Sequence, residues 1–221
     1  MMLHFAVLSA MTTKTPPPTA FALLALLSLQ PWTTYELARQ SERSLRWFFP
    51  RAERAVYQEA KRLVALGWAE AEDEWTGRRK STRYRITGSG RRVLRDWLAE
   101  DSPPLQVESE GLLKLFFSEQ AGTSSMRAGV QAMRRDAVAG LGTLGEQAAS
   151  WEAGRRPFPD RAATNAVSMS LVAELQRTVV RWADWAQDAL DRVEAGPESA
   201  AEFAEEFYRT LAAEAEPEPP R

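Results

Sequence analysis

The apolar and polar positions between residues 19 and 100 have helical spacing first, then the alternation that is typical of short strands, and then helical spacing again. The strand-like segments are 68–74 and 82–87, and a glycine-containing turn joins them. Three helices, a two-stranded hairpin and a fourth helix, in that order, predict a winged helix-turn-helix domain over residues 19–101.

The third helical pattern begins at Pro50 and ends at Gly67. Proline suits the first turn of a helix, where its missing N–H is not needed, and glycine is a common helix stop. At about 100° per residue, Val56, Ala60 and Leu63 fall on one face. The opposite face and its margin carry Arg51, Arg54, Tyr57, Gln58 and Lys61. This polar face predicts a helix that reads DNA, although a merely solvated face would have the same pattern.

The turn between the two strands contains three consecutive cations, Arg78, Arg79 and Lys80. In the second strand, basic residues such as Arg83 alternate with apolar ones, so one side of the hairpin stays cationic. Cations in such a place need only a polyanion, since contacts to phosphate set affinity and register without specifying sequence. The hairpin is therefore predicted to be a wing that contacts the DNA backbone.

The net charge of −2 hides an uneven distribution along the 221 residues. Residues 1–95 hold 16 basic and 8 acidic side chains, whereas residues 96–221 hold 12 basic and 22 acidic side chains. This asymmetry suggests a part that binds nucleic acid joined to a part with another task. The negative net charge is therefore no objection to DNA binding.

Beyond residues 101–104, which have the composition of a linker, only helical periodicity is found. Segment 112–117 is so apolar that we expect it to be buried on several sides. Two long stripes, 130–151 and 172–193, predict an antiparallel pair of helices whose packing continues into a second chain. With a terminal amphipathic helix they predict an all-helical dimerisation and effector domain over residues 105–213. The fold class is therefore mainly α.

The two ends of the chain differ from the rest in composition. Residues 1–18, which finish in three prolines, predict a poorly ordered arm, and the acidic, proline-rich residues 214–221 predict a disordered tail. The apolar run 21–29 is far shorter than the ~20 residues that span a bilayer, so no membrane partner is expected. The absence of cysteine fits a cytoplasmic protein and excludes thiolate chemistry and disulfide scaffolds.

Several of these segments resemble the PadR family of transcriptional regulators. The resemblance rests on Leu24–Leu29 with Tyr35-Glu36-Leu37, on Val56-Tyr57 with Lys61–Leu63 and Gly67, on Arg83–Thr87 with Gly90, and on 112–117 and 155–159. Three positions depart from the family's pattern: Arg54-Ala55 stands for its small residue before the tyrosine, Gln58 for its proline, and Thr34 for its glycine. These departures leave the fold alone and concern the bases that are read.

The resemblance implies a homodimeric repressor that binds a palindromic operator in double-stranded DNA. In this arrangement the third helix enters the major groove, the wings touch the backbone or the minor groove, and the half-sites lie about one helical turn apart. The residues expected to contact DNA are Tyr35, Arg51, Arg54, Tyr57, Gln58, Lys61, Arg78, Arg79, Lys80 and Arg83. Arginine is the commonest reader of guanine, which favours Arg51 and Arg54 as base contacts. Tyr57 is also compatible with a plain packing role.

The eight tryptophans suggest a second ligand. The residues on which a flat aromatic effector could stack, as in family members that sense planar small molecules, are Trp97, Trp151, Trp182 and Trp185. Burial in the core or at a dimer interface is the other interpretation, because aromatic side chains are the usual anchors of obligate interfaces.

Catalytic classes find little support in this sequence. The only histidine, His4, lies in the predicted arm, so neither a Ser-His-Asp arrangement nor a histidine-rich metal site is expected. No glycine-rich phosphate loop is present in the sequence, and no cofactor or metal is predicted. The competing hypothesis is a winged helix that serves as a protein-interaction or small-molecule-binding module without operator recognition. Such a module would not need cations on both the third helix and the wing.

Overall fold

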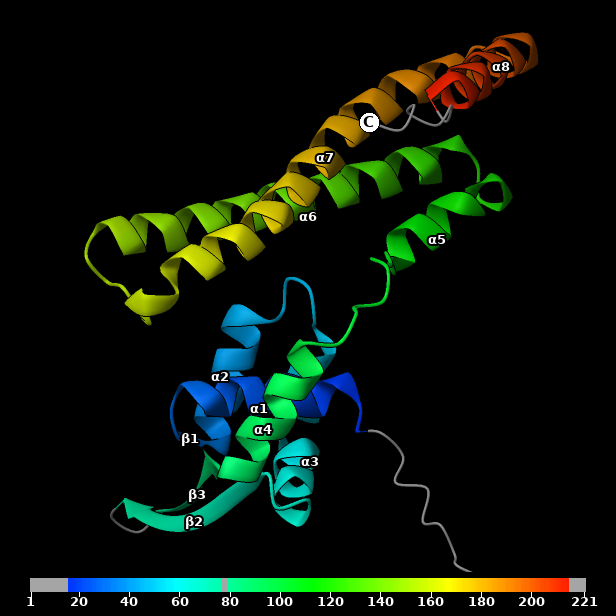
Figure 1. The fold of residues 1–221 in the computed structure, drawn as a ribbon. Coiled ribbons are helices and arrows are strands. Elements are labelled where there is room, and N and C mark those ends of the chain that lie inside the picture. Colours follow the sequence, from blue (N-terminus) through cyan, green and yellow to red (C-terminus); the bar gives the residue numbers. More distant parts are fainter. Residues whose placement is uncertain (1–15, 77–78, 215–221) are drawn as a thin grey trace, which may run out of the picture. The chain divides into compact units, whose positions relative to one another are not determined.

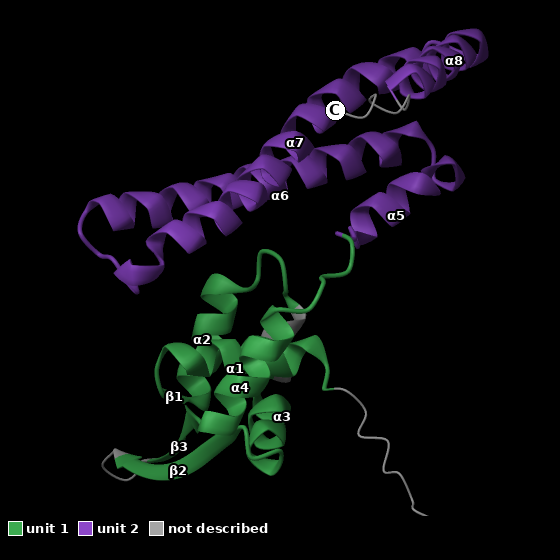
Figure 2. Cartoon of the chain, in the orientation of Figure 1, with its two compact units in different colours: residues 1–104 green, residues 105–221 purple. Residues whose placement is uncertain are grey.

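The computed structural model of the chain describes residues 16–76 and 79–214, coloured along the sequence in Figure 1. The chain divides into two compact units, residues 1–104 and 105–221 (Figure 2). Of the predicted arm, residues 1–15 lie outside the described part, and helix α1 begins at Pro18. Of the predicted tail, residues 215–221 lie outside it, and Glu214 is the last residue of a helix.

The first unit has helices packed beside a small antiparallel sheet. Its elements in chain order are α1 (Pro18–Leu29), β1 (Trp32–Thr33), α2 (Thr34–Ser44), α3 (Arg51–Ala65), β2 (Ala69–Thr76), β3 (Arg79–Ile86) and α4 (Gly88–Leu98). The strand order in the sheet is β1-β3-β2. The predicted order of elements is confirmed. The short strand β1 is an addition, because alternation over two residues is too brief to be recognised in a sequence.

The hairpin of β2 and β3 is longer than the sequence pattern predicted. Its register runs from Ala69 opposite Ile86 to Thr76 opposite Arg79, and residues 77–78 between the strands lie outside the described part. Polar and charged residues fill both strands near the turn, which is why this stretch resembled a loop. Arg79 and Lys80, which were predicted in the turn, therefore belong to β3.

Helix α1 forms the centre of the first unit. It is apolar on nearly all sides, and it packs against α2, α3, α4 and β3. Leu23, Leu24 and Leu27 are almost completely buried there, and burial of each such side chain stabilises the fold by about 1.5–3 kcal/mol. The apolar face predicted for α3 is confirmed by three fully buried residues: Val56, Ala60 and Leu63.

The second unit is helical in its described residues. It consists of α5 (Glu110–Phe116), α6 (Thr123–Glu152), α7 (Ala162–Glu194) and α8 (Pro197–Glu214), with short 3-10 turns at Ser118–Gln120 and Pro159–Arg161. Near the start of α6, Arg127 lies 2.8 Å from Asp191 of α7. Further along α6, Arg134 lies 2.6 Å from Asp184, earlier in α7, which confirms the predicted antiparallel pair. Among the described helices none combines the length and apolar character required to cross a membrane.

Segment 112–117, which we expected to be buried on several sides, is instead largely exposed. Leu115 packs against the core between α6 and α7, but Phe116 is 78% exposed, and Leu113 and Phe117 are also exposed. The high density of apolar residues predicted that the segment is buried, but it did not indicate which surface the segment would pack against. Within this chain, α5 packs on α6 through the side that carries Leu115, and its other apolar side chains point outward.

Gly90 lies where the start of α4 meets the residue before β2. A Cβ built on Gly90 would lie 2.1 Å from the carbonyl oxygen of Trp68, which is too close for any carbon atom. That oxygen already accepts a hydrogen bond from the backbone N–H of Thr87 at 3.0 Å. The backbone N–H of Gly90 in turn donates to Thr87 Oγ1 at 3.0 Å. These hydrogen bonds hold both the Trp68 carbonyl group and the start of α4 in place, so only glycine fits at position 90.

We predict that Gly90→Ala destabilises the first unit, because either the Trp68 carbonyl group or the start of α4 must move. The midpoint of thermal unfolding of the full chain, followed by circular dichroism, should fall by about 5 °C or more. Gly88→Ala is the matched control on the same helix, since a Cβ on Gly88 meets nothing within 4 Å. An unchanged midpoint for Gly90→Ala would show that the close contact relaxes at no cost.

Candidate nucleic-acid interface

The polar side of α3 faces away from the core of the first unit. Tyr57 is 63% exposed, and Gln58 and Lys61 are exposed beside it. Arg51 and Arg54 occupy the first turn of the helix, but their side chains lie outside the described part of the structure. The predicted recognition residues whose side chains are described therefore share one accessible face. Tyr57, which the sequence placed at the margin, belongs to that face.

Tyr35 stands in the first turn of α2, on a helix start that is held by a capping box. Thr33 Oγ1 accepts a hydrogen bond from the backbone N–H of Glu36 at 3.3 Å, and the backbone N–H of Thr33 donates to Glu36 Oε2 at 2.7 Å. Tyr35 is exposed, and the Arg39 guanidinium lies 5.8 Å from the centre of its ring. The Thr-x-x-Glu spacing of residues 33–36 is the signal in the sequence for this rigid start.

The wing carries almost as much negative charge as positive charge. Its strand β2 contributes four carboxylates: Glu70, Glu72, Asp73 and Glu74. Lys80 Nζ lies 2.7 Å from Asp73 Oδ2, so one predicted DNA-contacting cation is paired within the hairpin. The side chain of Arg79 lies outside the described part, as does the whole of Arg78. The cationic face expected from β3 is thus partly neutralised by β2.

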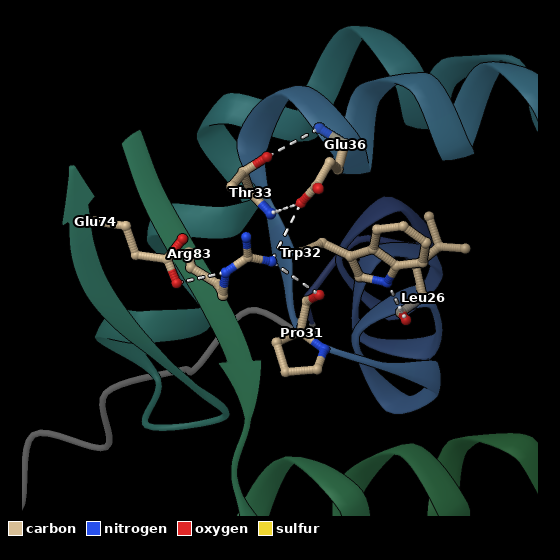
Figure 3. A network of polar contacts seen from close by, with 7 residues as sticks. All are labelled: Leu26, Pro31, Trp32, Thr33, Glu36, Glu74 and Arg83. Atoms are coloured by element: carbon tan, nitrogen blue, oxygen red, sulfur yellow. Dashed lines mark hydrogen bonds and ion pairs between the residues drawn. The ribbon is translucent and has the colours of Figure 1, made fainter. Parts of the chain in front are cut away.

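Arg83, which was predicted as a DNA contact, has protein partners on three segments (Figure 3). Its Nε donates to Glu74 Oε1 of β2 at 2.6 Å. Its Nη1 donates to Glu36 Oε2 of α2 at 3.3 Å and to the carbonyl oxygen of Pro31 at 3.4 Å. The hydrogen bond to Glu74 is the largest influence that holds the pKa of Arg83 above its ordinary value. The guanidinium therefore belongs to a network within the protein.

The four tryptophans predicted to hold an effector do not gather at one place. Trp97 of α4 stacks on Phe21 with ring centres 4.7 Å apart, so it belongs to the core of the first unit. In the second unit, Trp182 packs against the core between α6 and α7, and Trp185 is 46% exposed. Trp151 lies in the last turn of α6, far along the helix pair from Trp182. Among the described residues there is also no cluster of metal-ligating side chains.

Neither a protein-family model nor a curated protein sequence matches this chain. Solved structures match it in fold. Bacillus subtilis PadR in complex with operator DNA has a TM-score of 0.66 at 20% identity, over 79% of this chain and 99% of that one. A PadR-like transcriptional regulator from Bacillus cereus has a TM-score of 0.65 at 16% identity, over 78% of this chain and 98% of that one. The Vibrio cholerae virulence activator AphA has a TM-score of 0.57 at 18% identity, over 80% and 98%.

At these identities the likeness shows the fold. The predicted combination of a winged helix-turn-helix unit and a helical second unit is confirmed, and it is the fold of the PadR regulators. The expected resemblance to that family is therefore found in the comparison of folds.

We predict an acid-dependent contribution of Glu36 to stability. Its pKa is lowered from 4.5, chiefly by the hydrogen bond from the Thr33 backbone and further by the charge of Arg83. Such a carboxylate stabilises the fold above pH 4.5, and this contribution is lost as the pH falls through the lower folded-state pKa. In urea titrations, the difference in unfolding free energy between wild type and Glu36→Gln should be largest near neutral pH and shrink below pH 4.5. A difference that does not vary with pH would contradict this role.

Proposed function

We propose that this chain is a DNA-binding transcriptional regulator of the PadR family that reads double-stranded DNA with the polar face of α3. The observation that carries the proposal is that face itself: Tyr57, Gln58 and Lys61 are exposed on a helix whose opposite side is buried in the core. An α-helix, about 10–12 Å across with its side chains, fits the major groove of about 12 Å. The likeness in fold to a PadR structure with operator DNA supports the same use.

In the proposed complex, the first turn of α3 supplies the base contacts. Arg51 and Arg54 hydrogen-bond guanine O6 and N7, the commonest specific contact in the major groove. Gln58, one turn further on, has the amide that suits adenine or phosphate, and Lys61 neutralises phosphate at the far end of the helix. The exposed hydroxyl of Tyr57 donates to phosphate. Base specificity therefore comes from a short segment of one helix.

The remaining DNA contacts are assigned to the wing and to the start of α2. Arg78, Arg79 and Lys80 bind phosphates without reading bases. Lys80 exchanges Asp73 for a phosphate, which costs little because an exposed ion pair of this kind is worth at most about 1 kcal/mol. Tyr35 donates its hydroxyl to phosphate from the N-terminus of α2, where the helix dipole also favours an anion.

We infer that the regulator acts as a homodimeric repressor, with the second unit as the dimer interface. Exposed large apolar side chains occur on α5, at the residue that follows it and on the first half of α7: Leu113, Phe116, Phe117, Val167, Leu171 and Leu175. Apolar surface of this amount on a helical unit is typical of protein interfaces. A two-fold dimer doubles the base contacts and matches a palindromic operator.

A small aromatic effector that releases the DNA is the last part of the proposal. The ring of Trp185 lies 5.9 Å from that of Phe203 and 6.1 Å from that of Phe207, between ring centres. Because Trp185 is also exposed, a planar molecule has a surface on which to stack. Bacillus subtilis PadR has been solved in complex with p-coumaric acid, and that structure has a TM-score of 0.60 to this chain.

We predict a homodimer in solution. Light scattering of the full chain at micromolar concentration should give about twice the chain mass of 24.8 kDa. Phe116→Asp should lower the mass toward that of one chain, because it places a charge in the apolar surface of α5. Leu105→Asp, at an exposed position before α5, is the control and should leave the mass unchanged. A single-chain mass for the wild type would remove the basis for reading a palindrome.

The DNA-binding function is tested with a duplex that the wild-type protein selects from a random pool. Arg54→Ala should weaken binding to the selected duplex by about 1–3 kcal/mol and change binding to random duplex much less, because a hydrogen-bonding partner of a base is removed. Equal weakening on both duplexes would show that Arg54 touches only phosphate. Failure of the wild type to bind any duplex would instead favour the protein-interaction module.

The contrasting variant for this test replaces Arg78, Arg79 and Lys80 with Ala. Binding to both duplexes should weaken alike, and the slope of log K against log salt should fall by about 0.9 for each phosphate that the wing no longer neutralises. A slope that stays at the wild-type value would show that the wing does not touch phosphate.

A further inference from the structure

We propose that Arg83 is a positioning residue that fastens the wing to the first turn of α2, holding the wing and α3 in one geometry for DNA without touching DNA itself. The part of this inference that concerns DNA rests on the proposed function. The part that concerns the free protein rests on the contacts of the Arg83 side chain alone.

Arg83 lies where the three-stranded sheet becomes a two-stranded wing. Strand β1 pairs with β3 at two positions, Trp32 opposite Tyr84 and Thr33 opposite Arg83. From Thr82 toward the turn, the described residues of β3 pair with β2 alone. A two-stranded hairpin is by itself marginally stable in water. The direction of the two-stranded part of the wing therefore depends on the contacts that hold β2 and β3 near Arg83.

The Arg83 guanidinium bonds to residues on both sides of β3 (Figure 3). On one side it bonds Glu74 of β2, which lies in the outer part of the hairpin, at 2.6 Å. On the other side it bonds Glu36 of α2 and the carbonyl oxygen of Pro31, just before β1. The side chain is 30% exposed, so water and salt screen these bonds less than they screen a fully exposed pair. One side chain thus ties β2, α2 and the segment before β1 together.

Glu36 links the Arg83 side chain to the helix-turn-helix. Its Oε2 accepts one hydrogen bond from the Thr33 backbone, which closes the capping box of α2, and another from Arg83 Nη1. Helix α2 packs against α3. A wing that is fixed to α2 is consequently also fixed relative to α3, the proposed reading helix.

A direct phosphate contact is the rival role for Arg83, and the two roles predict opposite effects of changing Glu74. If Arg83 binds phosphate, Glu74→Gln frees the guanidinium and removes a negative charge close to the DNA, so binding strengthens. If Arg83 positions the wing, Glu74→Gln removes the charge that attracts Arg83 and weakens the tie to β2, so binding weakens. The sign of this single effect separates positioning from contact.

The experiment measures binding of the selected duplex by wild type, Arg83→Gln, Glu74→Gln and the double variant, each as the full chain. Each single variant should weaken binding about 3- to 10-fold, and the double variant should be no weaker than the more affected single, because both changes break one network. The matched control is Glu72→Gln. Glu72 carries the same charge on the same strand and lies opposite Arg83 in the register, yet no hydrogen bond or ion pair joins these two described side chains. Its binding should equal or slightly exceed that of the wild type, and stronger binding by Glu74→Gln would overturn the proposal.

Hydrogen exchange of the free protein separates failure of this proposal from failure of the proposed function. The amides of β1 and β3 should exchange faster in Arg83→Gln and Glu74→Gln than in wild type and Glu72→Gln. Unchanged exchange in α6 and α7 would show that the variants remain folded. If β1 and β3 exchange at the wild-type rate in both variants, the positioning role is wrong whatever happens to DNA binding. If they exchange faster but the wild type binds no duplex, the tie is supported and the proposed function is wrong.

Discussion

The burial of α1 is the interaction on which the arrangement of the first unit depends. Helix α3 presents a polar face only because its apolar face packs on α1. The sheet is tied to the same helix, since Trp32 Nε1 of β1 donates to the carbonyl oxygen of Leu26 at 2.9 Å. Phe21 of α1 also lies against the rings of Trp97 and Trp68, at 4.7 and 5.8 Å between centres. A change at α1 would therefore shift α3, the sheet and α4 together.

The wing extends from the sheet that this apolar centre holds, and it carries charges of both signs. The four carboxylates of β2 equal the cations of β3 in number, so the wing attracts a polyanion less strongly than β3 alone would. The cations also differ in exposure, since the Lys80 side chain is 54% exposed and that of Arg83 is 30% exposed. The exposed pair of Lys80 with Asp73 is weak, which suits the phosphate contact proposed for Lys80, whereas the Arg83 network joins three segments at once. Position within the fold thus separates two roles that the sequence assigned together.

Periodicity predicted α3 well because its buried positions recur with the helical repeat, and the face exposed by this burial could be predicted with it. It predicted the hairpin but made both strands too short, because residues near the junction such as Thr76, Arg79 and Lys80 are polar or charged and are held in the strands by pairing of β2 with β3. The prediction that Phe116 is buried was wrong, because an apolar composition does not specify which surface would cover the side chain. Periodicity could not predict the partners of Arg83, because Glu36 and Glu74 are distant from it in the sequence and come close to it only in the folded structure.

The two faces of α3 place different demands on the residues that they carry. The fold needs Val56, Ala60 and Leu63 on the inner face, where any loss of volume leaves a cavity. The outer face makes no such demand, because Gln58 and Lys61 are exposed and can be replaced without cost to packing. The likeness to solved structures at 16–20% identity shows the fold and carries no information on the residues of the outer face. The bases that the proposed reading helix would select therefore depend on residues that the fold does not fix.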